Sequence, residues 1–199
     1  MPWSGVRLYD RSFDQAMDEI DAAVARLRAK GAKKIVIAGH SLGGAAVLRY
    51  AALGRPADAF VTSAPGPVAE SQGYQRLVGD SVAKAQEMVA TGHSAGTAQF
   101  YDPNSGERFR ILQFTAEIYL SYNGPRGPSD MGANVRHLGP APILRLAPRF
   151  DPLTQAVDRL VWPQVPTSTP ATRIEVIADH LGAPAAGRDA VVDWLRQLN

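Results

Sequence analysis

The chain of 199 residues contains no cysteine. This absence excludes disulfide-stapled scaffolds, thiol nucleophiles and thiolate metal sites together, and it leaves the redox compartment open. Long hydrophobic runs are also missing, since no stretch approaches the roughly 18 apolar residues of a membrane span. The amino terminus has neither the basic region nor the apolar core of a signal peptide, so a cytoplasmic location is the default expectation.

The chain also lacks a large excess of charge of either sign. Lys and Arg number 21 against 19 Asp and Glu, which gives a formal net charge of +2. The densest basic group, residues 26–34, is expected to be a solvated helix end rather than the basic stripe of a nucleic-acid-binding protein. We therefore expect no nucleic-acid partner. The 45% of hydrophobic and 20% of charged residues are ordinary for one folded domain of this length.

The first periodic segment predicts a helix. Apolar residues recur at spacings of three and four over 12–30, where Ser12 and Gln15 fit a capping box and Gly31 suits the end of a helix. The next apolar run, 35–38, is too short for a helix and apolar on both faces. It predicts a buried parallel strand.

Helices and strands are expected to alternate through most of the remaining chain. A helix is expected at 42–53, strands at 59–61, 143–146 and 173–177, and a final helix with Val191, Trp194, Leu195 and Leu198 on one face. This alternation predicts a mostly parallel, three-layer α/β sheet with helices on both faces.

Residues 67–138 differ in character from the segments around them. They contain a polar helix candidate near 81–90, a hairpin candidate with strands 99–101 and 109–111 around the turn 102–106, a helix candidate at 114–122 and a Gly/Pro-rich turn at 123–128. We interpret 67–138 as an insertion between strands rather than as a separate domain. The whole chain, 1–199, is therefore expected to form a single domain.

A Gly-x-Ser-x-Gly pattern at 39–43, which we call the elbow, lies between the predicted strand 35–38 and the predicted helix 42–53. A serine on a sharp strand-to-helix turn presents its hydroxyl to substrate, and close packing requires small residues two positions to either side. The next backbone N–H points to where negative charge develops on the substrate oxygen. Ser41 is therefore the candidate nucleophile, and the N–H of Leu42 is a candidate oxyanion donor.

The same pattern recurs at 92–96, so the pattern by itself is a weak signal. This second copy follows a helical stretch and precedes the hairpin candidate. It lacks both the entering strand and the leaving helix. We interpret Ser94 as part of a glycine-rich turn.

A serine nucleophile needs a base, and histidine titrates in the right range. His180 follows the predicted strand 173–177, which places it at the carboxyl edge where open α/β sheets build their sites. It is the candidate base. His40 is expected to pack beside the elbow, because neighbouring side chains diverge on a tight turn. His93 belongs to the second copy of the motif, and His137 is interpreted as structural, with lining of the pocket as the alternative.

The third member of such a site holds the imidazole and stabilises its protonated form. In these sheets the order along the chain is serine, acid, histidine. Asp151, just past the strand 143–146, satisfies this order, although a turn or helix N-cap before Pro152 is the alternative interpretation. Asp158 falls within a helical stretch and Asp179 adjoins the candidate base, so both are weaker candidates.

These segments resemble the α/β-hydrolase superfamily, especially its esterase and lipase-like members. The elbow with Gly44 resembles the nucleophile elbow of that family, and 142–151 and 177–180 resemble its acid and histidine segments in the same order. The resemblance implies a serine hydrolase that cleaves carboxylic esters, or related acyl compounds, through an acyl-enzyme. It implies a small-molecule acyl substrate, no metal or cofactor, and a cap formed by 67–138 over the acyl pocket.

One feature departs from the family pattern. Its members normally have about four strands before the elbow strand, and the loop after the third supplies a second oxyanion donor. Here 34 residues precede Ile35. We therefore expect an N-terminally shortened α/β-hydrolase-like fold whose elbow strand is an exposed edge.

The missing strands leave two questions open. Truncation relative to the parent fold is the favoured explanation, and the alternatives are that residues 1–10, or another chain of a homo-oligomer, cover the edge. No second oxyanion donor is identified. The alternative function is a non-catalytic α/β-hydrolase-like module that binds a ligand or partner.

Overall fold

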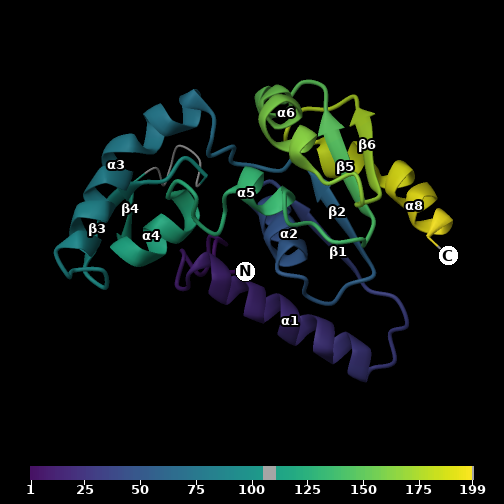
Figure 1. The fold of residues 1–199 in the computed structure, drawn as a ribbon, viewed down its shortest axis with the longest axis horizontal. Coiled ribbons are helices and arrows are strands. Elements are labelled where there is room, and N and C mark those ends of the chain that lie inside the picture. Colours follow the sequence, from purple (N-terminus) through teal and green to yellow (C-terminus); the bar gives the residue numbers. More distant parts are fainter. Residues whose placement is uncertain (105–110, 199) are drawn as a thin grey trace. The chain divides into compact units, whose positions relative to one another are not determined.

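The computed structural model describes residues 1–104 and 111–198 (Figure 1). The chain divides into two compact units, described separately below. Unit 1 comprises Met1–Ala22 and Ala69–Asp130, and unit 2 comprises Ala23–Val68 and Met131–Asn199. The predicted insertion, 67–138, contains the second segment of unit 1. Its function as a cap, and the single-domain organisation, stay predictions.

Unit 2 contains a four-stranded parallel sheet in the order β1-β2-β5-β6. The strands are β1 (Val36–His40), β2 (Ala59–Ser63), β5 (Ile143–Pro148) and β6 (Ala171–Val176). Their carboxyl ends are in line, since His40 lies opposite Ser63, and Ser63 opposite Leu146. The predicted parallel α/β sheet is therefore confirmed, with each strand within about two residues of its expected position.

The helices of unit 2 cover both faces of this sheet. They are α2 (Leu42–Ala52), α5 (Met131–Val135), α6 (Pro152–Ala156), the π-helical turn η2 (Val157–Val161), the 3-10 turn η3 (Trp162–Gln164), α7 (Ala183–Ala186) and α8 (Arg188–Gln197). Successive residues of a strand point to opposite faces. In β2, Phe60 contacts Tyr50 of α2, whereas Val61 packs in one cluster with Trp194 of α8. The sheet therefore lies between helices, as the three-layer prediction requires.

Strand β1 is an edge strand. It pairs with β2 alone in the described sheet, and Ala38 is exposed although Ile35 is buried. The strand at 35–38 is therefore less buried than its apolar run indicates, and the expectation that the elbow strand is an exposed edge agrees with the structure. Residues 1–10 form turns and contribute no strand to this sheet.

Unit 1 contains most of α1 (Phe13–Ala29), together with α3 (Gln72–Ala90), β3 (Thr97–Tyr101), β4 (Ile111–Thr115) and α4 (Ala116–Asn123). The predicted capping box of α1 is present, since the Ser12 N–H donates to Gln15 Oε1 at 2.9 Å and the Gln15 N–H to Ser12 Oγ at 3.3 Å. Gly31 ends this helical segment with a φ of 90°, a conformation that favours glycine.

The rest of unit 1 follows the predictions less closely. Helix α3 begins well before residue 81, because Ser71 caps it by accepting the Tyr74 N–H. Strands β3 and β4 form an antiparallel hairpin as predicted, but β4 continues to Thr115, so α4 begins two residues after the expected helix start at 114. Residues 105–110, which include part of the expected turn and second strand, lie outside the described residues. Aromatic rings form the interior of the unit: Tyr122 contacts Trp3, Tyr9 and Phe13.

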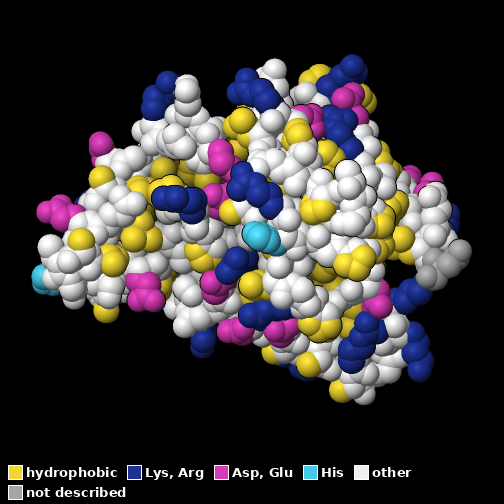
Figure 2. All heavy atoms as spheres, in the orientation of Figure 1, with side chains coloured by type: hydrophobic (Ala, Val, Ile, Leu, Met, Phe, Trp, Pro, Cys, Tyr) yellow, Lys and Arg dark blue, Asp and Glu magenta, His cyan; other side chains and the backbone are white. Residues whose placement is uncertain are grey.

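The face drawn in Figure 2 carries both signs of charge, with Lys and Arg interspersed among Asp and Glu. This distribution matches the scattered basic residues of the sequence. Among the helices of the described residues, none combines the length and apolar character needed to cross a membrane.

Candidate active site

Ser41 lies on the turn between β1 and α2. Strand β1 ends at His40 and α2 begins at Leu42, so Ser41 is the single residue between them. Its φ of 55° and ψ of −123° place it in a conformation that non-glycine residues rarely adopt. The Ser41 N–H donates to the Ser63 carbonyl at 3.0 Å, which ties the turn to β2. This is the strained strand-to-helix turn predicted at the elbow.

The glycines of the elbow differ in the space that each leaves for a side chain. A Cβ on Gly39 would lie 2.1 Å from the Gly43 carbonyl oxygen, and one on Gly44 would lie 2.9 Å from the Pro65 Cβ, whereas one on Gly43 would meet nothing within 4 Å. The expectation of close packing on both sides of the serine is therefore correct for Gly39 and wrong for Gly43. The reason is that the carbonyl of Gly43, rather than its α-carbon, faces Gly39.

The three residues singled out in the sequence lie together in unit 2. Ser41 Oγ is 2.9 Å from His180 Nε2, and His180 Nδ1 is 2.7 Å from Asp151 Oδ2. Each follows the carboxyl end of a different strand, namely β1, β6 and β5. Parallel strands bring such ends to one edge of the sheet, so residues separated by 139 positions in sequence become hydrogen-bonded neighbours.

Two backbone hydrogen bonds join the loop after β5 to the end of β6 and the loop that follows it. The Arg149 N–H donates to the Val176 carbonyl at 2.9 Å, and the Phe150 N–H donates to the Ala178 carbonyl at 3.0 Å. These bonds lie directly before the acid and the histidine in the chain. The distance between the two loops is therefore set by the backbone as well as by side chains.

Asp151 makes the contacts expected from both interpretations, because its two oxygens have different partners. Oδ1 accepts the Leu153 N–H at 2.9 Å and caps α6, while Oδ2 accepts from His180. The side chain is buried, with 2% of its surface exposed. A buried carboxylate with two donors is held in one orientation.

The hydrogen bonds shift both pKa values toward the charged forms. The bond with Asp151 raises the pKa of His180 above its ordinary value, against burial, which lowers it. Burial raises the pKa of Asp151, but the bonds from His180 and the Leu153 N–H outweigh it, so the pKa lies below its ordinary value. An ionised carboxylate only accepts, so His180 Nδ1 donates to it and Nε2 is left to accept the Ser41 hydroxyl proton.

The two rival acids bind elsewhere. Asp158 pairs with Arg145 at 2.5 Å and with Arg173 at 2.9 Å. Asp179 Oδ1 accepts the Gly182 N–H at 2.7 Å, which closes the turn after the histidine. Neither has a hydrogen bond to His180 among the described contacts.

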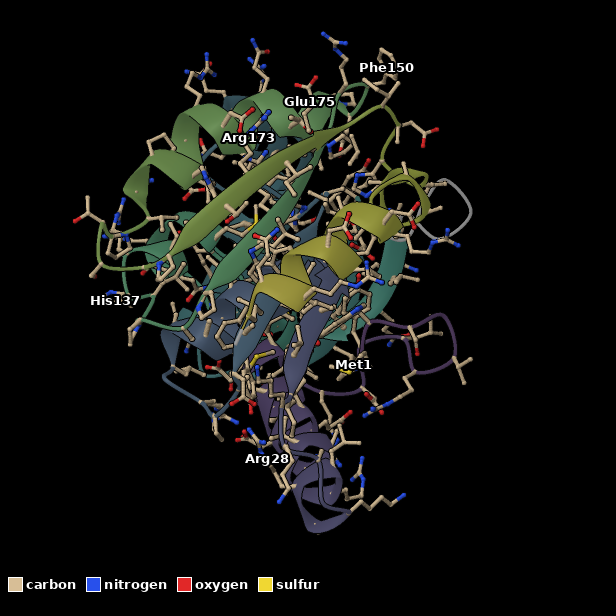
Figure 3. All side chains as sticks on the ribbon, turned by 90° about the vertical axis from the view of Figure 1, so that its right-hand side faces the viewer. Met1, Arg28, His137, Phe150, Arg173 and Glu175 are labelled. Carbon is tan, nitrogen blue, oxygen red and sulfur yellow. The ribbon has the colours of Figure 1, made fainter. Side chains whose placement is uncertain are left out.

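The remaining candidates have different surroundings. His93 and Ser94 belong to a turn between α3 and β3, where His93 Nδ1 is 3.1 Å from Thr91 Oγ1, so the second Gly-x-Ser-x-Gly copy is a turn as predicted. His137 is exposed, and Figure 3 shows it at the opposite end of the sheet from Phe150, the neighbour of the acid. His40 lies beside the histidine of the site, with its Nε2 2.8 Å from the His180 carbonyl oxygen.

The candidate oxyanion donor, the Leu42 N–H, lies at the start of α2. Leu42 is the first residue of that helix, so its N–H has no acceptor within the helix, and the helix dipole adds partial positive charge there. Within the described part of unit 2 no strand precedes β1, so the loop that the family resemblance implies for a second donor has no counterpart in it. Among the described residues, no group of three His, Asp or Glu side chains is arranged to hold a metal ion.

Residues 3–91 match the family model described as serine aminopeptidase, S33. None of the curated proteins compared with the chain matches it. The match includes the elbow and the strand and helix on either side of it.

Several solved structures share the fold. A monoacylglycerol lipase of Paleococcus ferrophilus is 18% identical with a TM-score of 0.61, and the alignment covers 95% of this chain and 77% of that one. The esterase domain of a Rhodothermus marinus protein is 18% identical with a TM-score of 0.59, covering 92% and 70%. A carboxylesterase structure from Nitrososphaera gargenis is 17% identical with a TM-score of 0.53, covering 94% and 73%.

The likeness extends over nearly the whole chain, including the parallel sheet. The chain thus has the α/β-hydrolase fold, with its described sheet beginning at the elbow strand, and its residues 3–91 are similar to the serine aminopeptidase family model.

Proposed function

We propose that this protein is a serine hydrolase that cleaves carboxylic esters, or related acyl compounds, through an acyl-enzyme. The observation that carries the proposal is the continuous line of hydrogen bonds from Ser41 Oγ through the His180 ring to Asp151. A hydroxyl, an imidazole and a buried carboxylate in this order form a nucleophile, a base and an orienting group. The structural similarity to a lipase and to esterases is consistent with this chemistry.

In the first half of the reaction, His180 acts as the base. Its Nε2 takes the hydroxyl proton while Ser41 Oγ forms a bond to the ester carbonyl carbon. The carbonyl electrons move onto oxygen, which accepts a hydrogen bond from the Leu42 N–H. The imidazolium then gives its proton to the alcohol oxygen as the carbon–oxygen bond breaks, so the alcohol leaves and the acyl group stays on serine.

In the second half, the same groups act on water. His180 takes a proton from water as the water oxygen attacks the acyl carbon, and it returns that proton to Ser41 Oγ when the acyl–serine bond breaks. The carboxylic acid leaves and the starting enzyme is restored. Asp151 stays ionised throughout, holds the ring and stabilises the imidazolium.

The test is covalent labelling and turnover with a matched serine control. A fluorophosphonate probe is expected to label Ser41, identified by peptide mass, and the protein is expected to hydrolyse p-nitrophenyl acetate or butyrate. Ser41→Ala should remove both, whereas Ser94→Ala, in the second copy of the same motif, should leave both unchanged.

The opposite result would identify a different kind of protein. Absence of labelling and of an acyl burst in the folded wild type contradicts the proposal. Ligand binding that is the same in wild type and Ser41→Ala would then support the non-catalytic module. Label at Ser94 would show that the wrong copy of the motif had been assigned.

A further inference from the structure

His40 makes a direct hydrogen bond to the backbone of the proposed base. Its Nε2 is 2.8 Å from the carbonyl oxygen of His180, and the centroids of the two rings are 4.9 Å apart. A carbonyl oxygen only accepts hydrogen bonds, so Nε2 must carry the proton. The bond joins residues 140 positions apart in the sequence.

The consequence is that two consecutive residues hold His180 at two points. His40 contacts its backbone, and Ser41 contacts its side chain. His40 is also the last residue of β1, where it lies in register with Ser63 of the buried strand β2. The elbow therefore carries both the nucleophile and an anchor for the loop that brings the base.

We propose that His40 is a positioning residue of the reaction: its Nε2–H holds the His180 carbonyl and thereby sets the distance and direction of the His180 ring toward Ser41. This inference rests on the proposed function. Leu181, the residue after the base, is 79% exposed. Packing of the Leu181 side chain therefore does little to restrain the position of His180. Small displacements of a catalytic group are costly, since about 1 Å of misplacement can reduce the rate on the order of 100-fold.

The surroundings of His40 make its replacement feasible. Its side chain borders a mostly apolar groove of about 370 Å³, lined also by Val61, Pro184 and Val192. A side chain of similar volume can therefore be placed there without overpacking a closed core. The effect of losing the hydrogen bond can then be separated from the effect of losing the fold.

The experiment compares two replacements of similar length that differ in one property. His40→Gln keeps an N–H donor, and His40→Met removes it. We expect His40→Met to lower kcat/KM on p-nitrophenyl butyrate by about 10- to 100-fold, mainly through kcat with little change in KM. His40→Gln should recover most of this loss. His93→Met, at the matching position of the second motif, is the control and should behave as wild type.

Three outcomes overturn the inference while the proposed function stands. His40→Met with wild-type kcat/KM shows that the bond positions nothing. Equal losses in His40→Gln and His40→Met show that His40 acts through its titratable ring or its shape. A loss confined to KM shows a role in binding substrate. Failure of the proposed function is distinguishable, because the wild type itself would then be neither labelled nor active.

A measurement on the wild type covers the case in which His40→Met does not fold. Nitrogen NMR of the imidazoles, with the His40 signals assigned by their loss in His40→Gln, reports which ring nitrogen carries the proton. The inference requires a protonated Nε2 in the neutral ring. A neutral His40 with the proton on Nδ1 alone overturns it.

Discussion

The side chain of Asp151 makes two separate contacts in the candidate site. One of its oxygens caps α6 and the other accepts from His180. The acid is therefore fixed by the helix that it begins, and its charge is present in the folded state because the two hydrogen bonds outweigh burial. Because the two contacts use different oxygens, Asp151 can cap the helix and contact His180 at the same time. The two interpretations made from the sequence therefore do not exclude each other.

The pH dependence of the reaction follows from His180. The ring must be neutral to take the serine proton, and hydrogen bonding with Asp151 raises its pKa above 6.5. We expect kcat/KM to rise with pH, with a midpoint above 6.5. In Asp151→Asn the midpoint should fall, and kcat should drop on the order of 10⁴-fold because the favoured ring tautomer is lost. Rates on p-nitrophenyl acetate between pH 5 and 9 give these values.

Asp158→Asn is the control for this series, because Asp158 was the rival acid. The pH profile of its kcat/KM, measured per folded molecule, should have the same midpoint as that of the wild type. A wild-type midpoint at or below 6.5, or an unchanged midpoint in Asp151→Asn, contradicts the assignment of acid and base.

At the scale of elements, the buried guanidinium of Arg145 holds α6, the helix that Asp151 caps. Arg145 of β5 has 1% of its side chain exposed. It pairs with Asp158 of η2, donates to the Thr154 carbonyl of α6 at 3.3 Å and lies over the Trp162 ring of η3. A buried guanidinium keeps its charge only where it has such partners. One side chain thus fastens three short helical segments to the sheet near the site.

The elbow makes a second prediction at this scale. Gly39→Ala should destabilise the protein by about 1–3 kcal/mol, because the new Cβ would overlap the Gly43 carbonyl oxygen. Gly43→Ala has open space and lies within α2, so it should be neutral or stabilise by up to about 1 kcal/mol. Urea unfolding of both variants provides the free energies. Equal destabilisation would mean that the elbow is not packed as described.

For the molecule as a whole, the exposed edge strand β1 is expected to affect hydrogen exchange. We expect amide hydrogens of 36–40 to exchange with solvent faster than those of 143–148, because β1 pairs on one side and β5 on both. The other edge strand, β6, is the internal comparison and should resemble β1. Hydrogen-exchange mass spectrometry measures all three peptides.

Equal protection of β1 and β5 would contradict the description of β1 as an uncovered edge. In that event a second copy of the chain, one of the alternatives considered from the sequence, is the first explanation to test. Exchange that becomes slower with protein concentration would support it.

The sequence by itself determined the strands of the main sheet, several of the helices and the choice of the three residues of the candidate site. Spacing of apolar residues is a local property, so α1 with its capping box, the four strands and α8 could all be read within a few residues. Ser41, Asp151 and His180 could be chosen because each follows a predicted strand, and the ends of parallel strands meet at one edge.

Only the tertiary structure decided contacts whose partner is a backbone atom or a distant residue. The bond from His40 to the His180 carbonyl leaves no mark in the sequence, since every residue has a carbonyl. The open space at Gly43 and the pairing of Asp158 with Arg145 depend on where other elements pack. The partial burial of β1 has the same origin, because an apolar run shows what can be buried, and the neighbouring strands decide what is.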